Sequence, residues 1–115
     1  MLRNISLIVC LTLAALTAAC SNAPAQTPPA SPQITIKNFS FDPPALTVAP
    51  STEVVWTDQD GRHTVEADNG SFKSGTLVAG GTFKHRFDKA GVYRYFCEFH
   101  GSKGGHDMAG TVTVK

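Results

Sequence analysis

The stretch Asp88–His100, D-K-A-G-V-Y-R-Y-F-C-E-F-H, joins a strand pattern to a thiol and an imidazole. Side chains before the thiol alternate in character, which puts Tyr93, Tyr95 and Cys97 on one face of a predicted strand. His100 follows Cys97 by three residues. That spacing lets the chain leave the strand and turn an imidazole back toward the sulfur. The stretch therefore predicts a β-rich fold with a sulfur–nitrogen donor pair at the end of one strand.

Six further segments carry strand signals, and helix signals are nearly absent. Alternating or β-branched and aromatic residues, with Gly, Pro and Asp at the breaks, occupy residues 33–39, 45–49, 53–57, 63–67, 82–88 and 109–115. This pattern is typical of antiparallel strands. We predict an all-β Greek-key sandwich or small barrel of about seven to eight strands. A single helical turn near residues 68–75 fits the pattern as well.

Two more donors complete a set of four. Met108 lies beyond His100 across three glycines and is the only methionine after the initiator. His63 lies 34 residues before Cys97, in D-G-R-H-T-V. A thiolate, two imidazoles and a distant thioether are the donors of a blue copper electron-transfer site. We therefore predict a metal site formed by His63, Cys97, His100 and Met108, with one copper ion as the cofactor.

Each donor also has a simpler interpretation, as a packed cysteine or methionine or as a solvated histidine. His106, two residues before Met108, is a competing ligand. If His106 bound instead, one sulfur and three nitrogens would suit zinc or a non-blue copper site. His85 alternates with Phe83 and Phe87, so we interpret it as a histidine packed near a sheet rim.

The first 32 residues carry export and linker signals. Residues 1–20 combine an early arginine, an apolar run too short for a confident membrane span, and small residues, as in a secretory signal. Their end, L-T-A-A-C, resembles the lipobox of bacterial lipoproteins, with Thr17 where leucine is usual. We expect an exported protein, in the periplasm or at the cell surface, attached to a membrane through lipid on Cys20. A Cys20–Cys97 disulfide is the alternative.

The remaining composition indicates one small folded domain, residues 33–115, after a Pro- and Ala-rich linker at residues 21–32. Of the ten Lys and Arg residues, Arg3 lies in the removable segment, so nine basic residues face nine acidic ones. This balance, without a basic cluster, gives no reason to expect a nucleic-acid partner. We expect a monomer.

The whole domain resembles the cupredoxins, specifically the plastocyanin-like and pseudoazurin-like blue copper proteins. The resemblance covers residues 33–115 and rests on four runs: I-T-I-K-N-F-S-F-D-P-P-A-L-T-V-A-P-S-T-E-V-V-W, D-x-D-G-R-H-T-V, D-K-A-G-V-Y-R-Y-F-C-E-F-H and M-A-G-T-V-T-V. It implies a cupredoxin fold and one type 1 copper ion. It also implies transfer of single electrons, by Cu(II)/Cu(I) cycling, between redox partner proteins such as a cytochrome or a copper or haem oxidoreductase. A copper-delivery protein is the main other possibility. A copper enzyme would need more histidines than four.

Carried over by position, the family's two histidine ligands fall on His63 and His100, the thiolate on Cys97 and the axial thioether on Met108. Two departures from the family's pattern stand out. Seven residues rather than four separate His100 from Met108, and Thr64 follows the first histidine where asparagine is frequent. The contact that braces the ligand loops must therefore differ, although a backbone N–H donated to the Cys97 sulfur is compatible with both changes.

The resemblance also implies where electrons pass. The exposed edge of His100 would be the electron port, with Phe99 and Gly101 forming a small apolar docking surface around it.

Overall fold

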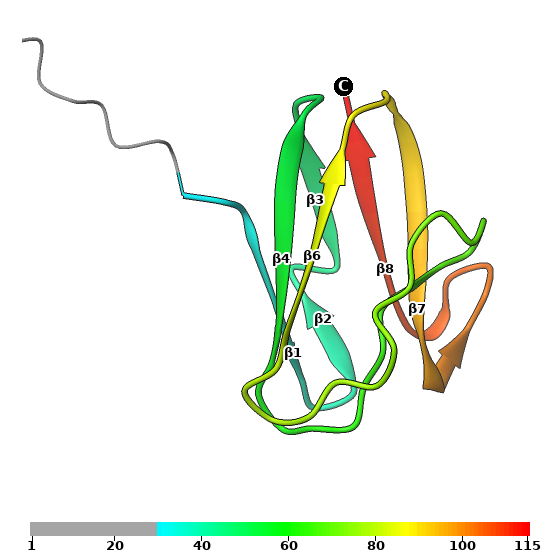
Figure 1. The fold of residues 1–115 in the computed structure, drawn as a ribbon. Coiled ribbons are helices and arrows are strands. Elements are labelled where there is room, and N and C mark those ends of the chain that lie inside the picture. The colour runs from blue at the N-terminus through cyan, green and yellow to red at the C-terminus, as the bar shows by residue number, and fades with distance from the viewer. Residues whose placement is uncertain (1–29) are drawn as a thin grey trace, which may run out of the picture.

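A computed structural model describes residues 30–115, which form two four-stranded sheets packed face to face (Figure 1). One sheet has the order β2-β1-β4-β6 and the other β3-β8-β7-β5. The strands are β1 (Gln33–Lys37), β2 (Ser40–Asp42), β3 (Ala45–Val48), β4 (Thr52–Asp58), β5 (Glu66–Ala67), β6 (Thr82–Phe87), β7 (Gly91–Ser102) and β8 (His106–Val114). The predicted all-β sandwich of seven to eight strands is confirmed.

The expectation of antiparallel pairing was wrong for two of the six strand pairs. β1 runs parallel to β4, and β3 runs parallel to β8. The other four pairs are antiparallel. Alternation along a strand reports which face is buried, and it carries no information on the direction of the neighbouring strand. Both parallel pairs join strands between which the chain crosses from one sheet to the other and back, so their direction is not set by a tight hairpin.

Several strand bounds also differ from the sequence pattern, and left-handed backbone explains one of them. The segment predicted over residues 33–39 stops at Lys37 because Asn38 and Phe39 have φ angles of 51° and 55°. The chain turns there into β2, a strand that the sequence did not suggest. The segment predicted over residues 63–67 contracts to β5, and His63 forms only an isolated bridge with Leu77. Residues 30–115 contain no helix, so the helical turn expected near residues 68–75 is absent. Within residues 30–115 there is therefore no helix long and apolar enough to cross a membrane.

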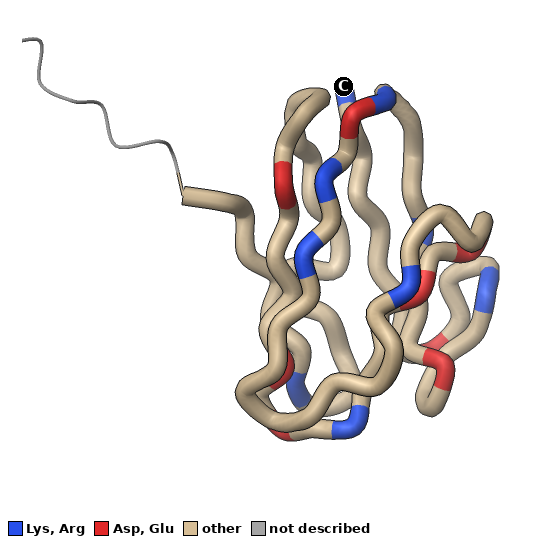
Figure 2. The backbone as a smooth tube through the Cα atoms, viewed as in Figure 1, with Lys and Arg blue, Asp and Glu red and all other residues tan. Residues whose placement is uncertain are grey.

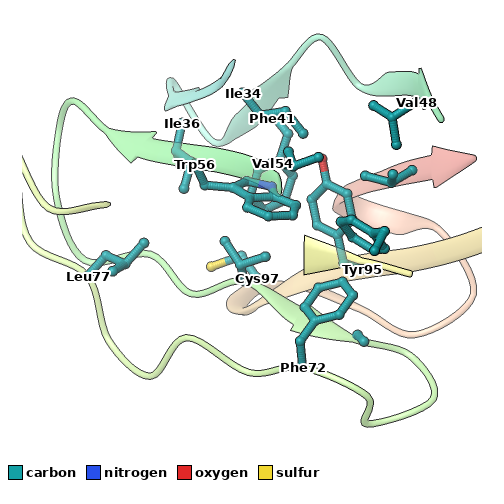
Figure 3. Close-up of a cluster of buried hydrophobic side chains, with 14 of the residues drawn as sticks. Ile34, Ile36, Phe41, Val48, Val54, Trp56, Phe72, Leu77, Tyr95 and Cys97 are labelled. Carbon is teal, nitrogen blue, oxygen red and sulfur yellow. The ribbon is translucent and has the colours of Figure 1, made fainter. Parts of the chain in front are cut away.

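The core between the sheets is built on aromatic side chains (Figure 3). Trp56 of β4 and Tyr95 of β7 are fully buried and meet edge to face, with ring centroids 5.4 Å apart. Phe72 lies beside both rings. Full burial of one large apolar side chain contributes about 1.5–3 kcal/mol to stability, so this cluster supplies much of what holds the small domain together. His85 packs between Phe72 and Phe87 at the rim, as its alternation predicts.

The sandwich has two unlike ends. The turn after β1, the segment after β4 and the hairpin between β7 and β8 come together at the lower end in Figure 1. The C-terminus and the turn between β6 and β7 lie at the other end. The expected signal at residues 1–20, the lipid on Cys20 and most of the linker at residues 21–32 fall outside the described residues.

Candidate metal centre

Three of the four predicted donors meet at the lower end of the sandwich. The Cys97 Sγ lies 3.8 Å from the His63 Nδ1 and 3.6 Å from the His100 Nδ1. The three donor atoms all lie within 4.8 Å of one another. Cys97 and His63 are buried, whereas His100 is half-buried. The side chains therefore form a compact His–Cys–His group that is closed on the protein side and reaches solvent through one imidazole.

Local backbone geometry explains why these side chains converge. Cys97 points inward from β7 and belongs to the buried cluster that contains Trp56. The register between β7 and β8 is irregular between Phe96 and Gly101, which lets the chain turn His100 back toward the sulfur.

His63 is held by a tight turn after β4. The Asp58 Oδ1 accepts hydrogen bonds from the backbone N–H groups of Asp60 at 3.2 Å and Gly61 at 2.8 Å. Gly61 and Arg62 then take left-handed φ angles of 89° and 56°, which reverse the chain just before His63.

The spacing of the donors fits a first-row transition metal ion. Bonds of about 2.0–2.1 Å to nitrogen and about 2.3 Å to sulfur, at tetrahedral to trigonal angles, place the two donor atoms roughly 3.5–3.8 Å apart. The two measured sulfur–nitrogen distances, 3.6 and 3.8 Å, agree with this range. Soft sulfur combined with two imidazoles selects copper or zinc over magnesium or calcium. The group is thus preorganised at metal-binding distances.

Thr64 braces the ligand loops at the position where asparagine is frequent in the family. Its backbone N–H donates to the Cys97 Sγ at 3.4 Å, and its Oγ1 accepts a hydrogen bond from the Glu98 N–H at 2.8 Å. Thr64 is fully buried. The residue after the first histidine therefore still links the two ligand segments, through a hydroxyl rather than an amide.

Asp60 contacts a predicted ligand, and the sequence analysis did not single it out. Its Oδ1 lies 2.8 Å from the His63 Nε2, and its Oδ2 accepts a hydrogen bond from the Asn38 N–H at 2.7 Å. The Asn38 N–H, followed by the hydrogen bond to His63, lowers the pKa of the Asp60 carboxyl below its ordinary value. A carboxylate three residues before a candidate histidine ligand, within a Gly-containing turn, was the available signal.

Met108 and His106 occupy different environments. Met108 is 2% exposed and lies in the buried cluster with Cys97, whereas His106 is exposed. The extra residues between His100 and Met108 extend β7 and β8 into a hairpin in which Ser102 pairs with His106. His106 is not part of the His–Cys–His group. The longer loop thus places the competing imidazole on the surface.

Aromatic side chains surround the exposed edge of the site. Phe39 is 66% exposed, and its ring lies edge-on to the His100 ring with a centroid distance of 4.7 Å. Phe99 is 41% exposed, with the Arg62 guanidinium 5.1 Å above its ring. A hollow lined by Phe39, Arg62 and both histidines opens to solvent here. Phe39 was not expected from the sequence, because 59 residues separate it from Phe99.

Comparison with known proteins assigns the family. The model of the Cupredoxin-like domain matches residues 6–114 of this chain. The chain belongs to the cupredoxin-like family. A plastocyanin from Scenedesmus fuscus is 31% identical, in an alignment that covers 65% of this chain and 86% of the plastocyanin.

Solved structures agree with the fold. A purple cupredoxin from Nitrosopumilus maritimus is 32% identical with a TM-score of 0.62, over 74% of this chain and all of that one. An oxidised methionine-to-leucine mutant of amicyanin is 22% identical with a TM-score of 0.65, over 74% of this chain and 82% of amicyanin. A copper-containing nitrite reductase from Thermus scotoductus also superposes, but only over 22% of its own chain. With this family and this His–Cys–His group, the protein is a blue copper electron-transfer protein.

Proposed function

We propose that this cupredoxin carries single electrons between redox partner proteins outside the cytoplasm, with one copper ion held by His63, Cys97, His100 and Met108. The observation that carries the proposal is the convergence of one thiol and two imidazole Nδ1 atoms at 3.6 and 3.8 Å. A bound copper ion would supply the one-electron Cu(II)/Cu(I) couple. The cupredoxin chain supplies a fixed donor geometry that both oxidation states tolerate, so little must move when an electron arrives.

The buried location of the donors favours a carrier over an enzyme. Cys97, His63 and Met108 are each at most 3% exposed. With Met108 as a weak axial ligand, no position at the metal would remain for a substrate. The Thr64 N–H would stabilise the thiolate charge, because a hydrogen bond to the charged form of a group favours that form.

The surface around His100 is the proposed electron port. His100 is the half-buried ligand, and Phe39 and Phe99 flank its ring at centroid distances of 4.7 and 6.3 Å. This docking surface, formed by Phe39, Phe99 and Gly101, is apolar and small, which suits brief encounters with a partner. Figure 2 shows charges of both signs at both ends of the sandwich, so charge alone does not select the docking end.

The sequence before the domain supports attachment to a membrane in the periplasm or at the cell surface. The L-T-A-A-C run would provide a lipidated Cys20, and residues 21–32 would separate the lipid from the sandwich. Residues 30–32 leave the side of the first sheet and not the end that holds the donors (Figure 1). A tether at this position leaves the docking surface free. Mass spectrometry of the mature protein from membranes tests this part, and an unmodified Cys20 would contradict it.

Redox titration of the copper-loaded protein tests the carrier function. We expect one electron per chain, full reversibility, and retention of copper through dialysis in both oxidation states. A copper-delivery protein would instead release the metal readily on reduction. Loss of copper on each reduction cycle would therefore overturn the proposal.

Electron self-exchange tests the docking surface without knowledge of the partner. Phe99→Glu and Phe39→Glu should each slow exchange between oxidised and reduced protein, measured by NMR line broadening in mixed samples, because the new charges repel each other. Val92→Glu is the matched control, since Val92 is 65% exposed near the start of β7, at the opposite end. Equal rates in all three variants would show that electrons leave elsewhere.

A further inference from the structure

The two imidazoles of the metal centre have unequal surroundings. The His63 Nε2 lies 2.8 Å from a carboxylate oxygen of Asp60. Within residues 30–115, no carboxylate forms a hydrogen bond or ion pair with the His100 ring. His63 is also buried, while His100 is half-buried. One ligand is therefore anchored by a carboxylate, and the other is half-buried between aromatic rings without such a contact.

The Asp60 contact fixes the tautomer of His63. An ionised carboxylate only accepts hydrogen bonds, so the His63 Nε2 must carry the proton. A neutral imidazole has a single N–H, which leaves the Nδ1 with a free lone pair. That Nδ1 is the atom 3.8 Å from the Cys97 sulfur. The side chain is thus set to bind a metal before any metal arrives.

The same carboxylate also holds the aromatic cover of the site. Its second oxygen accepts the Asn38 N–H at 2.7 Å. Asn38 and Phe39 have left-handed φ angles, which residues other than glycine adopt only at a cost in free energy. The hydrogen bond to Asp60 stabilises this turn and so places the Phe39 ring against His100 at 4.7 Å and His63 at 6.2 Å.

We propose that Asp60 is a positioning residue that fixes His63 in its metal-binding tautomer and lowers the reduction potential of the copper site. The inference rests on the proposed function. The oxidised centre carries one more positive charge than the reduced one, and a carboxylate hydrogen-bonded to a ligand stabilises the more positive state. Because the Asp60 side chain is 42% exposed, water screens part of this effect.

The reduction potential of Asp60→Asn in the copper-loaded protein tests the charge. Asparagine keeps the size and an acceptor oxygen but removes the negative charge. We expect the Cu(II)/Cu(I) equilibrium to shift toward Cu(I) by about tenfold, which corresponds to about 59 mV for one electron. The visible thiolate band should remain. Asp88→Asn is the matched control, since it removes an equal charge from an exposed Arg86 pair at the other end of the sandwich. Equal potentials in Asp60→Asn and wild type would overturn the tuning role.

Nitrogen NMR of the metal-free protein tests the positioning without copper. The His63 ring should show an Nε2–H tautomer in the wild type and a mixture of tautomers in Asp60→Ala. An Nδ1–H ring in the wild type would refute the assignment, even if no variant could be produced. If copper gave no thiolate band at all, the proposed function would fail, while the tautomer measurement would still decide the role of Asp60.

Discussion

The aromatic core and the metal end of this cupredoxin are built in opposite ways. Around Trp56 the side chains are mostly apolar and buried, and none of these core residues has a left-handed φ angle. At the metal end, buried polar groups gather, and four of the five non-glycine residues with left-handed φ angles in the described part of the chain lie there: Asn38, Phe39, Arg62 and Asp107. Such backbone costs stability and persists only where the surroundings hold it. The core therefore supplies the stability that the metal end requires.

Cys97 belongs to both regions. Its backbone continues β7, its side chain lies in the cluster with Trp56, and its sulfur accepts the Thr64 N–H. If the two regions are separable, core substitutions should change stability and leave the copper spectrum intact, while substitutions at the metal end should do the reverse.

Trp56→Ala should have the largest effect on stability. Removing a fully buried aromatic side chain costs about 3–5 kcal/mol, a large share of the 5–15 kcal/mol typical of a whole domain. Urea unfolding of the metal-free protein measures the loss. The visible band of the molecules that remain folded should keep its position, and a shifted band would show that the two regions are coupled.

Two glycines near the β7–β8 hairpin offer a sharper comparison. A Cβ on Gly110 would collide with the Tyr95 hydroxyl in the core, and a Cβ on Gly101 would collide with the Met108 backbone. Overpacking of this kind costs about 1–3 kcal/mol. We expect Gly110→Ala to lower the free energy of unfolding and keep the spectrum, and Gly101→Ala to alter the spectrum. An altered spectrum in both variants would contradict the separation.

Met108→Leu compared with His106→Ala assigns the axial position. Leucine conserves volume, so the free energy of unfolding without metal should change by less than about 1.5 kcal/mol. The visible band of the copper-loaded protein should shift, since a weak axial ligand tunes the site. His106→Ala should leave both unchanged because His106 is exposed. A larger spectral change in His106→Ala than in Met108→Leu would reverse the assignment.

His85 should give the smallest effect, a pH dependence of stability. Burial lowers its pKa below 6.5, partly opposed by Asp88. The unfolded chain therefore takes up this proton at a higher pH than the folded one. The stability that neutral, buried His85 contributes is fully present above pH 6.5. As the pH falls below 6.5 and past the lower pKa of the folded state, the free energy of unfolding decreases. Urea midpoints at several pH values should fall less in His85→Gln than in wild type, with His106→Ala as the control. Parallel curves for all three would exclude a role for His85.

Sequence reasoning reached the residues whose signal is local. Alternation along β7 placed Tyr95 and Cys97 on the buried face, and the short spacing to His100 predicted the donor pair. His63 followed from the family pattern, and the structure brings it to the sulfur. The alternation and the Cys97–His100 spacing depend on neighbours in the chain, which a sequence displays directly, whereas His63 required the family pattern.

Features that depend on distant segments were not accessible. Phe39 covers His100 only because β1 ends in a left-handed turn, and Asp60 reaches Asn38 across 22 positions. The parallel pairing of β1 with β4 likewise depends on how the chain crosses between sheets. No local pattern encodes these contacts, since each is decided by which segments the fold brings together.

The optical spectrum of the Cu(II)-loaded protein tests the central claim most directly. If His63, Cys97 and His100 bind one copper ion, the protein will show an intense visible band from thiolate-to-copper charge transfer. Cys97→Ser will abolish that band. A colourless copper complex, or a band that survives Cys97→Ser, would contradict the account.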